Sequence, residues 1–249
     1  MLTIPIRFLT ELGQVFIFMF QTLLLVLKPP YRVSLLFRSM QFVGVGSLFI
    51  VVLTGTFSGA VMTLQGLYAF GMINQEPMVG ASVALALTRE LSPVLAALMV
   101  SGRAGSAMAT ELGTMRVTEQ IDAMETMSVN PIQYLVVPRV VASATMMPML
   151  TILFTMVGMA GTYFVAVTWH GVDLGLFMQN IRLYVSVDDI YNGLYKSIFF
   201  GLTFSVIACY KGFHAGGGAR GVGLATTGSV VMSSVMIFVM DYALTAIMF

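Results

Sequence analysis

Charged side chains are scarce in this chain. Asp, Glu, Lys and Arg make up only 9% of its 249 residues, against roughly 25% in soluble globular proteins. A soluble domain of this length needs more charge than this to cover its surface, so that class is excluded. The net charge is +1, which leaves no strongly basic face for nucleic acid.

Residues that carry out catalysis or bind metals are equally few. The one cysteine, Cys209, lies in an apolar run and has no partner for an internal disulfide. The two histidines, His170 and His214, fall on opposite sides of the membrane that the apolar runs below predict, so they cannot share a metal ion. The chain has no Ser–His–Asp set and no HExxH motif, and no Lys-Ser or Lys-Thr pair follows the glycines at 214–223 as a Walker A loop requires. We therefore expect a protein that is not an enzyme, without a metal or cofactor of its own.

Apolar residues, by contrast, form long runs. They account for 58% of the chain, and a run of 18 or more is long enough to cross a bilayer as a helix. Five such spans are predicted, at about 42–70, 83–101, 140–168, 191–210 and 229–249. The predicted fold class is an all-α integral membrane protein, a single domain over residues 1–249 in which 39–249 form the five-helix region.

The N-terminal region before these spans has a different pattern. Its apolar run, residues 15–27, is too short to cross a bilayer and ends at Lys28. An amphipathic helix that lies in the membrane interface fits better, and Pro29 and Pro30 end it. We assign residues 1–38 to this interfacial helix and to an elbow that leads into the first span.

Positive charge is distributed unevenly between the two sides of the predicted spans. Nine of the twelve Lys and Arg residues fall on one side: Arg7, Lys28, Arg32, Arg38, Arg103, Arg116, Arg139, Lys211 and Arg220. Positive residues favour the cytoplasmic side, so we expect this side and the N-terminus to be cytoplasmic. Five spans then place the C-terminus outside.

The segment between the second and third spans, residues 102–138, is polar and rich in small residues. Small residues recur there at four-residue steps, a spacing that lets helix backbones approach closely. The second half predicts a short amphipathic helix capped by Thr118. Its apolar face carries Val117, Ile121 and Met124, and its acidic face carries Glu119, Asp122 and Glu125. Such a helix either decorates a loop or docks a soluble partner.

Four ionisable residues lie inside the predicted spans: Arg89, Glu90, Lys196 and Asp241. A charge without a partner costs about 2.5–3.5 kcal/mol to insert into a membrane. At ~1.5 Å per residue, three of them lie at one level, roughly 10 Å from the outer surface. They either form ion pairs that fix helix packing, such as Arg89 with Asp241 or Glu90 with Lys196, or line an outward-facing cavity for a charged head group.

An apolar stripe near the outer end of the first span is a candidate wall for acyl chains. Met62, Ala69 and Ile73 recur there at helical spacing, with Phe70 beside them. The same pattern also occurs in ordinary helix packing. The glycine-rich residues 211–228 are read as a flexible connection on the cytoplasmic side.

The chain resembles the MlaE (YrbE-type) family, the permeases of lipid ABC transporters, over nearly its whole length. The resemblance is closest in the segment GRAGSAMATELGTMRVTEQIDAMETMSVNPIQYLVVPR at 102–139. It extends to LQG at 64–66, ALTRELSPVLAALMVSGR at 86–103, GVGLATT at 221–227 and DYALTAIMF at 241–249. One departure is Leu224, which stands where some relatives carry a basic residue.

The resemblance implies binding residues and partners. The family's coupling helix lies in this segment, so we expect contacts with a cytoplasmic ABC ATPase, which would hold ATP and Mg²⁺, at Glu111, Thr114, Arg116, Glu119, Asp122 and Glu125. The positions of Arg89, Glu90 and Lys196 belong to the family's lipid-binding region, while Asp241 is either a lipid contact or a structural partner. The other implied partners are a second copy in a homodimer, a small cytoplasmic STAS-domain protein and a periplasmic MCE-domain protein.

The predicted function is therefore a permease subunit in the bacterial inner membrane. It would move phospholipid between the inner and outer membranes, which maintains outer-membrane lipid asymmetry, and a separate ATPase would power it. Two alternatives stay open. One is an ion-coupled secondary transporter that uses the buried charges directly. The other is a permease for another lipid, such as a sterol or a fatty acid.

Overall fold

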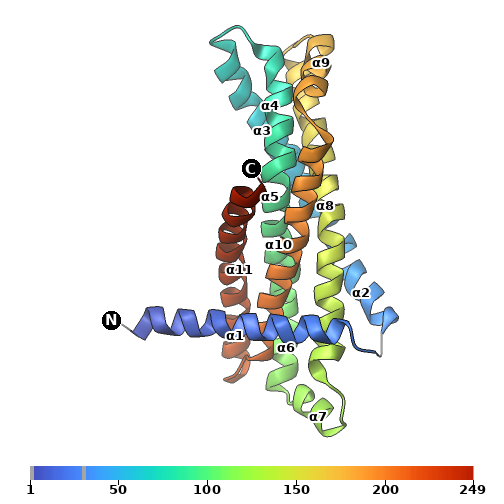
Figure 1. The fold of residues 1–249 in the computed structure, drawn as a ribbon, viewed down its shortest axis with the longest axis vertical. Coiled ribbons are helices and arrows are strands. Elements are labelled where there is room, and N and C mark those ends of the chain that lie inside the picture. Colours follow the sequence, from blue (N-terminus) through green and yellow to red (C-terminus); the bar gives the residue numbers. More distant parts are fainter. Residues whose placement is uncertain (1–2, 30–31, 249) are drawn as a thin grey trace.

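The structure is a computed structural model that describes residues 3–29 and 32–248, with side chains from residue 10 onward except at residue 12. Within these residues the chain forms helices and turns without a strand (Figure 1). Five stretches are long and apolar enough to cross a membrane: Val33–Gly71, Glu76–Val117, Ile132–Trp169, Val187–Phe213 and Gly218–Met248. The predicted all-α membrane fold is confirmed. The predicted end of the last span at Phe249 and the side chain of Arg7 lie outside the described residues.

Two short helices mark the opposite ends of the bundle. Helix α7, Gln120–Thr126, lies at one end and α9, Leu174–Tyr184, at the other (Figure 1). Asp173 caps α9 by accepting a hydrogen bond from the Leu176 N–H at 2.8 Å. The predicted spans 140–168 and 191–210 left the residues between them as a loop. The cap at Asp173 explains why part of this connection is helical instead. The two ends are called the α7 end and the α9 end below.

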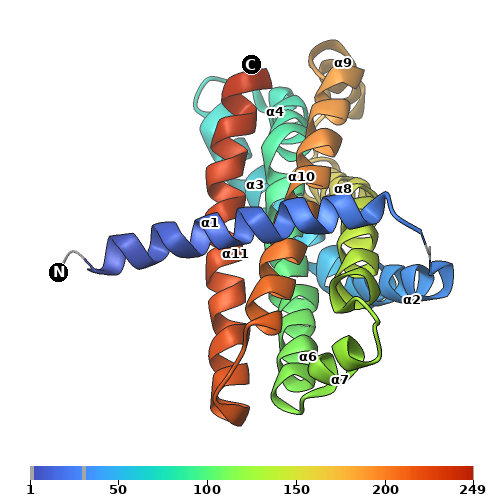
Figure 2. The same cartoon turned by 60° about the horizontal axis from the view of Figure 1, so that its bottom comes forward.

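Helix α1, Thr3–Val26, lies across the bundle instead of along it (Figures 1 and 2). Phe18 packs edge-on against Tyr210 of α10, Val187–Phe213, with ring centroids 5.7 Å apart. The Tyr210 hydroxyl donates to Gln14 Oε1 at 2.6 Å, and Lys211 pairs with Glu11 at 3.0 Å. A helix held across the spans in this way fits the predicted interfacial helix.

The elbow is longer than predicted. Helix α2, Val33–Val43, is followed by a short 3₁₀ turn, η1 (Val45–Ser47), before α3, Leu48–Gly71, begins. The sequence ends the elbow at residue 38 because Arg32 and Arg38 flank the apolar run that begins at Phe42. The structure breaks the helix at Gly44, where a Cβ atom would collide with Met146 of α8 (Val137–Tyr163).

The second membrane helix runs further toward the α7 end than predicted. It consists, in order, of η2 (Glu76–Met78), α4 (Val79–Ala86), the π-helical η3 (Leu87–Leu91), α5 (Ser92–Val100), the π-helical η4 (Ser101–Gly105) and α6 (Ser106–Val117). The sequence ended this span at Ser101 because polar residues follow. The hydroxyls of Ser106, Thr110 and Thr114 donate to carbonyls one turn earlier, so the helix itself satisfies them. Its small residues then let α6 pack closely against α10 and α11.

The last two membrane helices meet in a tight turn. Helix α10 ends at Phe213 and α11, Gly218–Met248, begins five residues later. The predicted flexible connection over 211–228 is therefore wrong in extent. Gly217 and Gly218 make the turn at φ +81° and +71°. The later glycines continue as helix because α11 lies against α6, where Gly113 faces the side chain of Val222. The third membrane helix combines the π-helical η5 (Ile132–Val136), α8 and the π-helical η6 (Phe164–Trp169).

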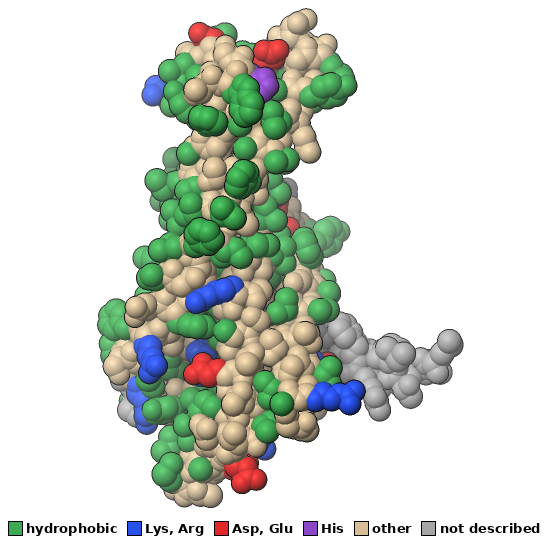
Figure 3. All heavy atoms as spheres, turned by 180° about the vertical axis from the view of Figure 1, so that it is seen from behind, with side chains coloured by type: hydrophobic (Ala, Val, Ile, Leu, Met, Phe, Trp, Pro, Cys, Tyr) green, Lys and Arg blue, Asp and Glu red, His purple; other side chains and the backbone are tan. Residues whose placement is uncertain are grey.

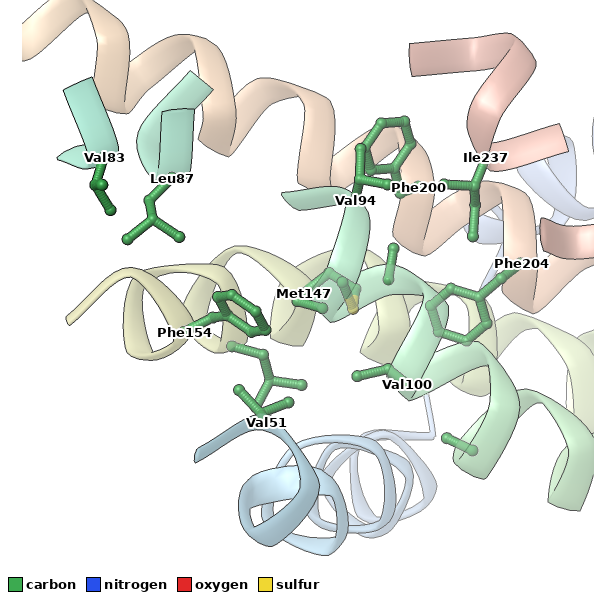
Figure 4. Packing of buried hydrophobic residues seen from close by; sticks show 14 of the residues in the cluster. Val51, Val83, Leu87, Val94, Val100, Met147, Phe154, Phe200, Phe204 and Ile237 are labelled. Atoms are coloured by element: carbon green, nitrogen blue, oxygen red, sulfur yellow. The ribbon is translucent and has the colours of Figure 1, made fainter. Parts of the chain in front are cut away.

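Helix backbones approach one another closely in the core. Helix α8 packs against α3 on one side and α10 on the other. A Cβ atom at Gly59 of α3 would overlap the backbone of Gly158 in α8, and one at Gly161 would overlap the Thr56 carbonyl. Gly55 and Gly59, four residues apart in a GxxxG pattern, are both buried on this side. This pattern lets two membrane helices pack closely. Apolar side chains fill the surrounding space, among them Val51, Leu87, Met147, Phe154, Phe200 and Phe204 (Figure 4).

The outer surface of the bundle is also largely apolar (Figure 3). On the face shown there, Lys and Arg side chains lie mostly in the half that carries α7. Helices α3 and α11 are the least buried of the spans. They expose large apolar side chains, among them Phe49, Phe57, Tyr68, Phe238 and Tyr242. These two helices therefore offer faces for lipid or for another apolar protein surface.

Candidate functional site

A lysine lies inside the bundle with carboxylates from two other helices around it. Lys196 of α10 is 0% exposed. Its Nζ donates to Glu90 Oε2 in η3 at 2.5 Å, to Asp241 Oδ1 in α11 at 3.1 Å and to Thr245 Oγ1 in α11 at 2.7 Å. An ammonium group has three N–H donors, so all of them are used. We call these four residues the charged cluster. One ion pair that the sequence suggested, Glu90 with Lys196, is present.

Local backbone features bring the three helices together here. Residues 87–91 form the π-helical turn η3, which contains Glu90, and such turns are frequent at functional sites. Gly193, one turn before the lysine, meets the backbone of η3 so closely that no Cβ atom fits. Thr245 follows Asp241 by one helical turn, so both face the same side of α11. Thr245 is not among the predicted site residues, although the four-residue spacing between Asp241 and Thr245 was a usable signal.

Arg89 turns to a different partner. Its Nε donates to Asp189 Oδ1 at 2.7 Å. Asp189 Oδ2 accepts from both the N–H and the hydroxyl of Ser186 at 2.9 Å, which caps the start of α10. The sequence placed Asp189 in a connection and suggested Asp241 for Arg89. The structure gives Arg89 to Asp189 and Asp241 to Lys196, because the capping box draws Asp189 into α10.

The charged cluster is open on one side. The side chains of Glu90 and Asp241 are 37% and 21% exposed. Roughly 10 Å of helix separates Asp241 from the end of α11 at Met248, at about 1.5 Å per residue. An exposed carboxylate at this depth would meet hydrocarbon, which is costly unless protein or a water-filled cavity covers it. The cluster therefore needs a cover on this side that the described residues do not provide.

The cluster also determines which groups are available to a ligand. Lys196 already donates all three N–H groups, to Glu90, Asp241 and Thr245, and its predicted contact with lipid stays a prediction. Arg89 is 38% exposed at the side chain and lies next to Glu90 in the same turn. Both side chains are thus partly exposed, whereas the lysine is buried. Such an arrangement suits a head group that carries both charges.

The predicted acyl-chain wall divides into two parts. Met62 and Phe70 are partly buried and pack against the bundle core. Ala69 and Ile73 are exposed, and Ile73 follows the end of α3 at the α9 end of the bundle. Two residues therefore take part in helix packing, while the other two face outward. Lipid contact by this stripe stays a prediction.

Helix α7 is the short helix predicted between the second and third spans. Ile121 is fully buried and Met124 partly buried, so the apolar face packs on protein. The predicted cap is wrong, because Thr118 donates its hydroxyl to the Thr114 carbonyl at 2.9 Å. Glu119, at φ +60°, makes the turn from α6 into α7 instead. A left-handed residue other than glycine is uncommon, and nothing in the side-chain pattern indicates it.

Some polar residues of the segment 102–139 form ion pairs within the chain. Arg116 pairs with Asp122, and Arg139 Nη2 lies 2.9 Å from Glu111 Oε2. The other predicted coupling residues are exposed and take part in no ion pair among the described residues: Thr114, Glu119 and Glu125. Glu111 and Arg139 line a separate cavity of about 550 Å³ between α2, α6, α7 and the start of α8. The exposed carboxylates of Glu119 and Glu125 are thus the residues of this set best placed to reach another molecule.

Arg103 joins the second membrane helix to the elbow. Its Nη1 donates to the Phe42 carbonyl, and the guanidinium lies 4.6 Å from the centroid of the Phe42 ring. Gly46 makes room for this side chain, since a Cβ atom there would overlap the guanidinium. The sequence counted Arg103 only as a positive charge on one side. Contacts between residues 61 apart in the chain leave no local signal.

Metal ligands do not gather in this structure: the described residues hold no group of three or more His, Cys, Asp or Glu arranged for an ion. Comparison with known proteins decides the family. The family described as Permease MlaE matches residues 36–247. The chain belongs to the MlaE permease family.

Three relatives show how far the similarity extends. A probable ABC transporter permease protein of Rickettsia felis is 41% identical over 244 residues, 98% of this chain and 94% of the relative. The intermembrane phospholipid transport system permease protein MlaE of Haemophilus influenzae is 39% identical, with 98% of each chain covered. Protein TRIGALACTOSYLDIACYLGLYCEROL 1, chloroplastic, of Arabidopsis thaliana is 38% identical over 92% of this chain and 65% of its own length.

The MlaE match covers the parts of the chain that carry the site. The matched residues 36–247 include the charged cluster and α7, and they overlap all five spans. The bacterial relatives extend the similarity over 98% of the chain, and so into α1. This MlaE family member is therefore a multi-pass membrane permease, and its named bacterial relatives are permeases as well.

Proposed function

We propose that this chain is the permease subunit of an ABC transporter that moves phospholipid between two membranes, and that a separate ATPase subunit binds ATP and Mg²⁺. The charged cluster, open on one side within a span, carries the proposal. The name of the Haemophilus influenzae relative, an intermembrane phospholipid transport system permease, supports the cargo. In bacteria such a machine would maintain the lipid asymmetry of the outer membrane.

A second copy of the chain provides the cover that the charged cluster needs. Asp241 lies on α11, one of the two least buried spans. In a homodimer that pairs the exposed faces of α11, the two clusters would border a shared cavity. Arg89 and Glu90 would meet the lipid head group there, with the apolar faces of α3 and α11 beside the acyl chains. The closed cavity removes the cost of exposing carboxylates to hydrocarbon.

The charge distribution supports an orientation with the α7 end in the cytoplasm. Nine of the twelve Lys and Arg residues belong to segments at that end, which is the side that positive residues favour. The N-terminus is then cytoplasmic and the C-terminus periplasmic, with the protein in the bacterial inner membrane. The α9 end would face the periplasm.

Helix α7 is the proposed docking site for the ATPase. Its buried Ile121 fixes it to the bundle, and Glu119 and Glu125 remain exposed. Movement of the ATPase would reach the charged cluster through α6, which continues as one helix into η3. A small cytoplasmic STAS-domain protein would complete the assembly at this end. A periplasmic MCE-domain protein would receive lipid at the α9 end.

Two alternative functions are each favoured by an observation. A buried Lys side chain in contact with partly buried Glu and Asp side chains is what an ion-coupled secondary transporter would use. The name of the Arabidopsis thaliana relative is that of a glycolipid, which favours a lipid cargo other than phospholipid. Sterols and fatty acids belong to the same group of alternative cargoes.

Reconstitution with the subunits that co-purify tests these functions together. We expect an ATPase subunit to co-purify and fluorescent phospholipid to move only when ATP is present. Dissipating proton and sodium gradients should leave the rate unchanged. Transport that stops when the gradients collapse, or a chain that never co-purifies with an ATPase, would overturn the proposal. Mass spectrometry of co-purified lipid separates phospholipid from the other cargoes.

A further inference from the structure

A groove lies at the corner where α1 leads into α2. The charged cluster lies nearer the other end of the bundle. The volume of the groove is about 170 Å³. The walls are almost wholly apolar and come from the end of α1, from α2 and from the start of α8: Leu25, Val26, Val33, Leu36, Val137 and Val141. We call it the elbow groove.

Two cations lie at the rim of the elbow groove. Lys28 and Arg32 are exposed, and no ion pair among the described residues includes either of them. Gln133 donates to the Lys28 carbonyl at 2.8 Å, which fixes the backbone at the rim. The Arg32 guanidinium lies 4.2 Å from the centroid of the Tyr134 ring. None of the described residues that line the groove is acidic.

An apolar slot with two cations at its mouth matches an amphiphile with a negative head. We propose that the elbow groove binds an anionic phospholipid from the leaflet at the α7 end, as a site separate from the transported lipid. Lys28 and Arg32 hold the phosphate and its neighbouring oxygens, and an acyl chain begins along Leu36 and Val141. Basic pockets between helices on the cytoplasmic side are known to bind anionic head groups in this way.

The position of the elbow groove explains why this lipid would be retained and not transported. Helix α1 lies across the bundle (Figures 1 and 2). A helix in this orientation lies in the membrane interface, so its end would be level with the lipid head groups. The charged cluster lies toward the other surface. A lipid in the groove touches α1, α2 and α8 at once and would hold the corner from which the first span starts. Binding of this lipid therefore does not depend on which lipid is transported, on the direction of transport or on ATP.

Lipid retention by the intact permease tests the site. The permease is purified with its co-purifying chains, and native mass spectrometry follows the binding of phosphatidylglycerol and phosphatidylcholine. We expect phosphatidylglycerol to be preferred. The double variant Lys28→Gln/Arg32→Gln should bind it roughly 25-fold more weakly, from a factor of about five for each cation. The control Arg220→Gln removes an exposed cation from the same end of the bundle and should bind normally.

A matched pair of tryptophan variants tests the apolar slot. Leu36→Trp fills the groove, whereas Phe37→Trp changes its exposed neighbour. We expect only Leu36→Trp to lose the lipid, with both variants eluting from size exclusion like the parent. Equal binding of both lipids, normal binding in the double variant, or displacement by soluble glycerol phosphate would each overturn the proposal. Dissociation of the oligomer in Leu36→Trp would assign the groove to a protein contact and overturn it as well.

Discussion

Replacing Lys196 by methionine removes the cation from the charged cluster and keeps most of its volume. Glu90 and Asp241 then face each other with only the Thr245 hydroxyl as a donor from the cluster. The folded permease loses stability because two carboxylates inside a span no longer have a counter-charge. The chemically milder changes Glu90→Gln and Asp241→Asn each leave the lysine paired with the other carboxylate.

The expected magnitude follows from the contacts. A hydrogen bond to a charged group contributes about 1.5–3 kcal/mol, and Lys196 makes one to each carboxylate. Removing the shared partner of a buried pair costs about 3–5 kcal/mol. We expect Lys196→Met to be destabilised by this amount and each single carboxylate variant by about half of it. The triple variant Lys196→Met/Glu90→Gln/Asp241→Asn leaves no unpaired charge and should regain most of the loss.

Chemical unfolding in mixed micelles measures these differences, and lipid transfer is assayed on the same preparations. A Lys196→Met variant as stable as the parent would refute the description of the cluster as a buried ion network. If the triple variant regained both stability and transport, the cluster would have only a structural role. Recovery of stability without transport is the result that we expect, since Glu90 faces the open side.

Three further predictions concern other contacts. Arg103→Ala should lower the free energy of unfolding by about 1.5–3 kcal/mol, because it removes a charged hydrogen bond to the elbow. Arg103→Lys should not restore it, since a lysine cannot reproduce the planar guanidinium; full rescue by lysine would contradict this. Gly59→Leu should separate α3 from α8 and lower the melting temperature, whereas Gly223→Ala, at a position with open space, should not; equal melting temperatures would argue against the close contact. Glu119→Lys should weaken co-purification of the ATPase without changing the melting temperature, while Glu76→Lys at the other end should have no effect. Normal ATPase recovery with Glu119→Lys would remove the support for docking at α7.

Much of the fold follows from local pattern. Runs of apolar residues long enough to cross a bilayer locate all five spans, because a helix satisfies every backbone hydrogen bond within the run itself. The errors lie at the ends of helices. The sequence ends the second span at Ser101 because polar residues follow, and it predicts a flexible connection over the glycine-rich residues 211–228, yet residues 102–117 and 218–228 are helical. In each case a neighbouring helix accepts the small residues, and that neighbour is not visible in the local sequence.

The site was predictable to a similar degree. Charges inside apolar runs identify Glu90, Lys196 and Asp241, because an unpaired charge there is too costly to be incidental. The partner of Arg89 was not predictable, since Asp189 lies outside the apolar run and enters the helix through its capping box. The contact of Arg103 with the elbow also depends on helices that are distant in sequence.

The sequence by itself determined that this is a five-span membrane protein with a resemblance to lipid permeases. Hydropathy and the scarcity of charge are properties of single residues and their near neighbours, so they can be read along the chain. The tertiary structure alone decided that Lys196 saturates its three donors with Glu90, Asp241 and Thr245, and that Arg89 pairs with Asp189 instead. It also formed the elbow groove from segments more than 100 residues apart, as the Lys28–Gln133 contact illustrates. Such sites arise from the packing of helices, because each helix contributes only one or two of the groups.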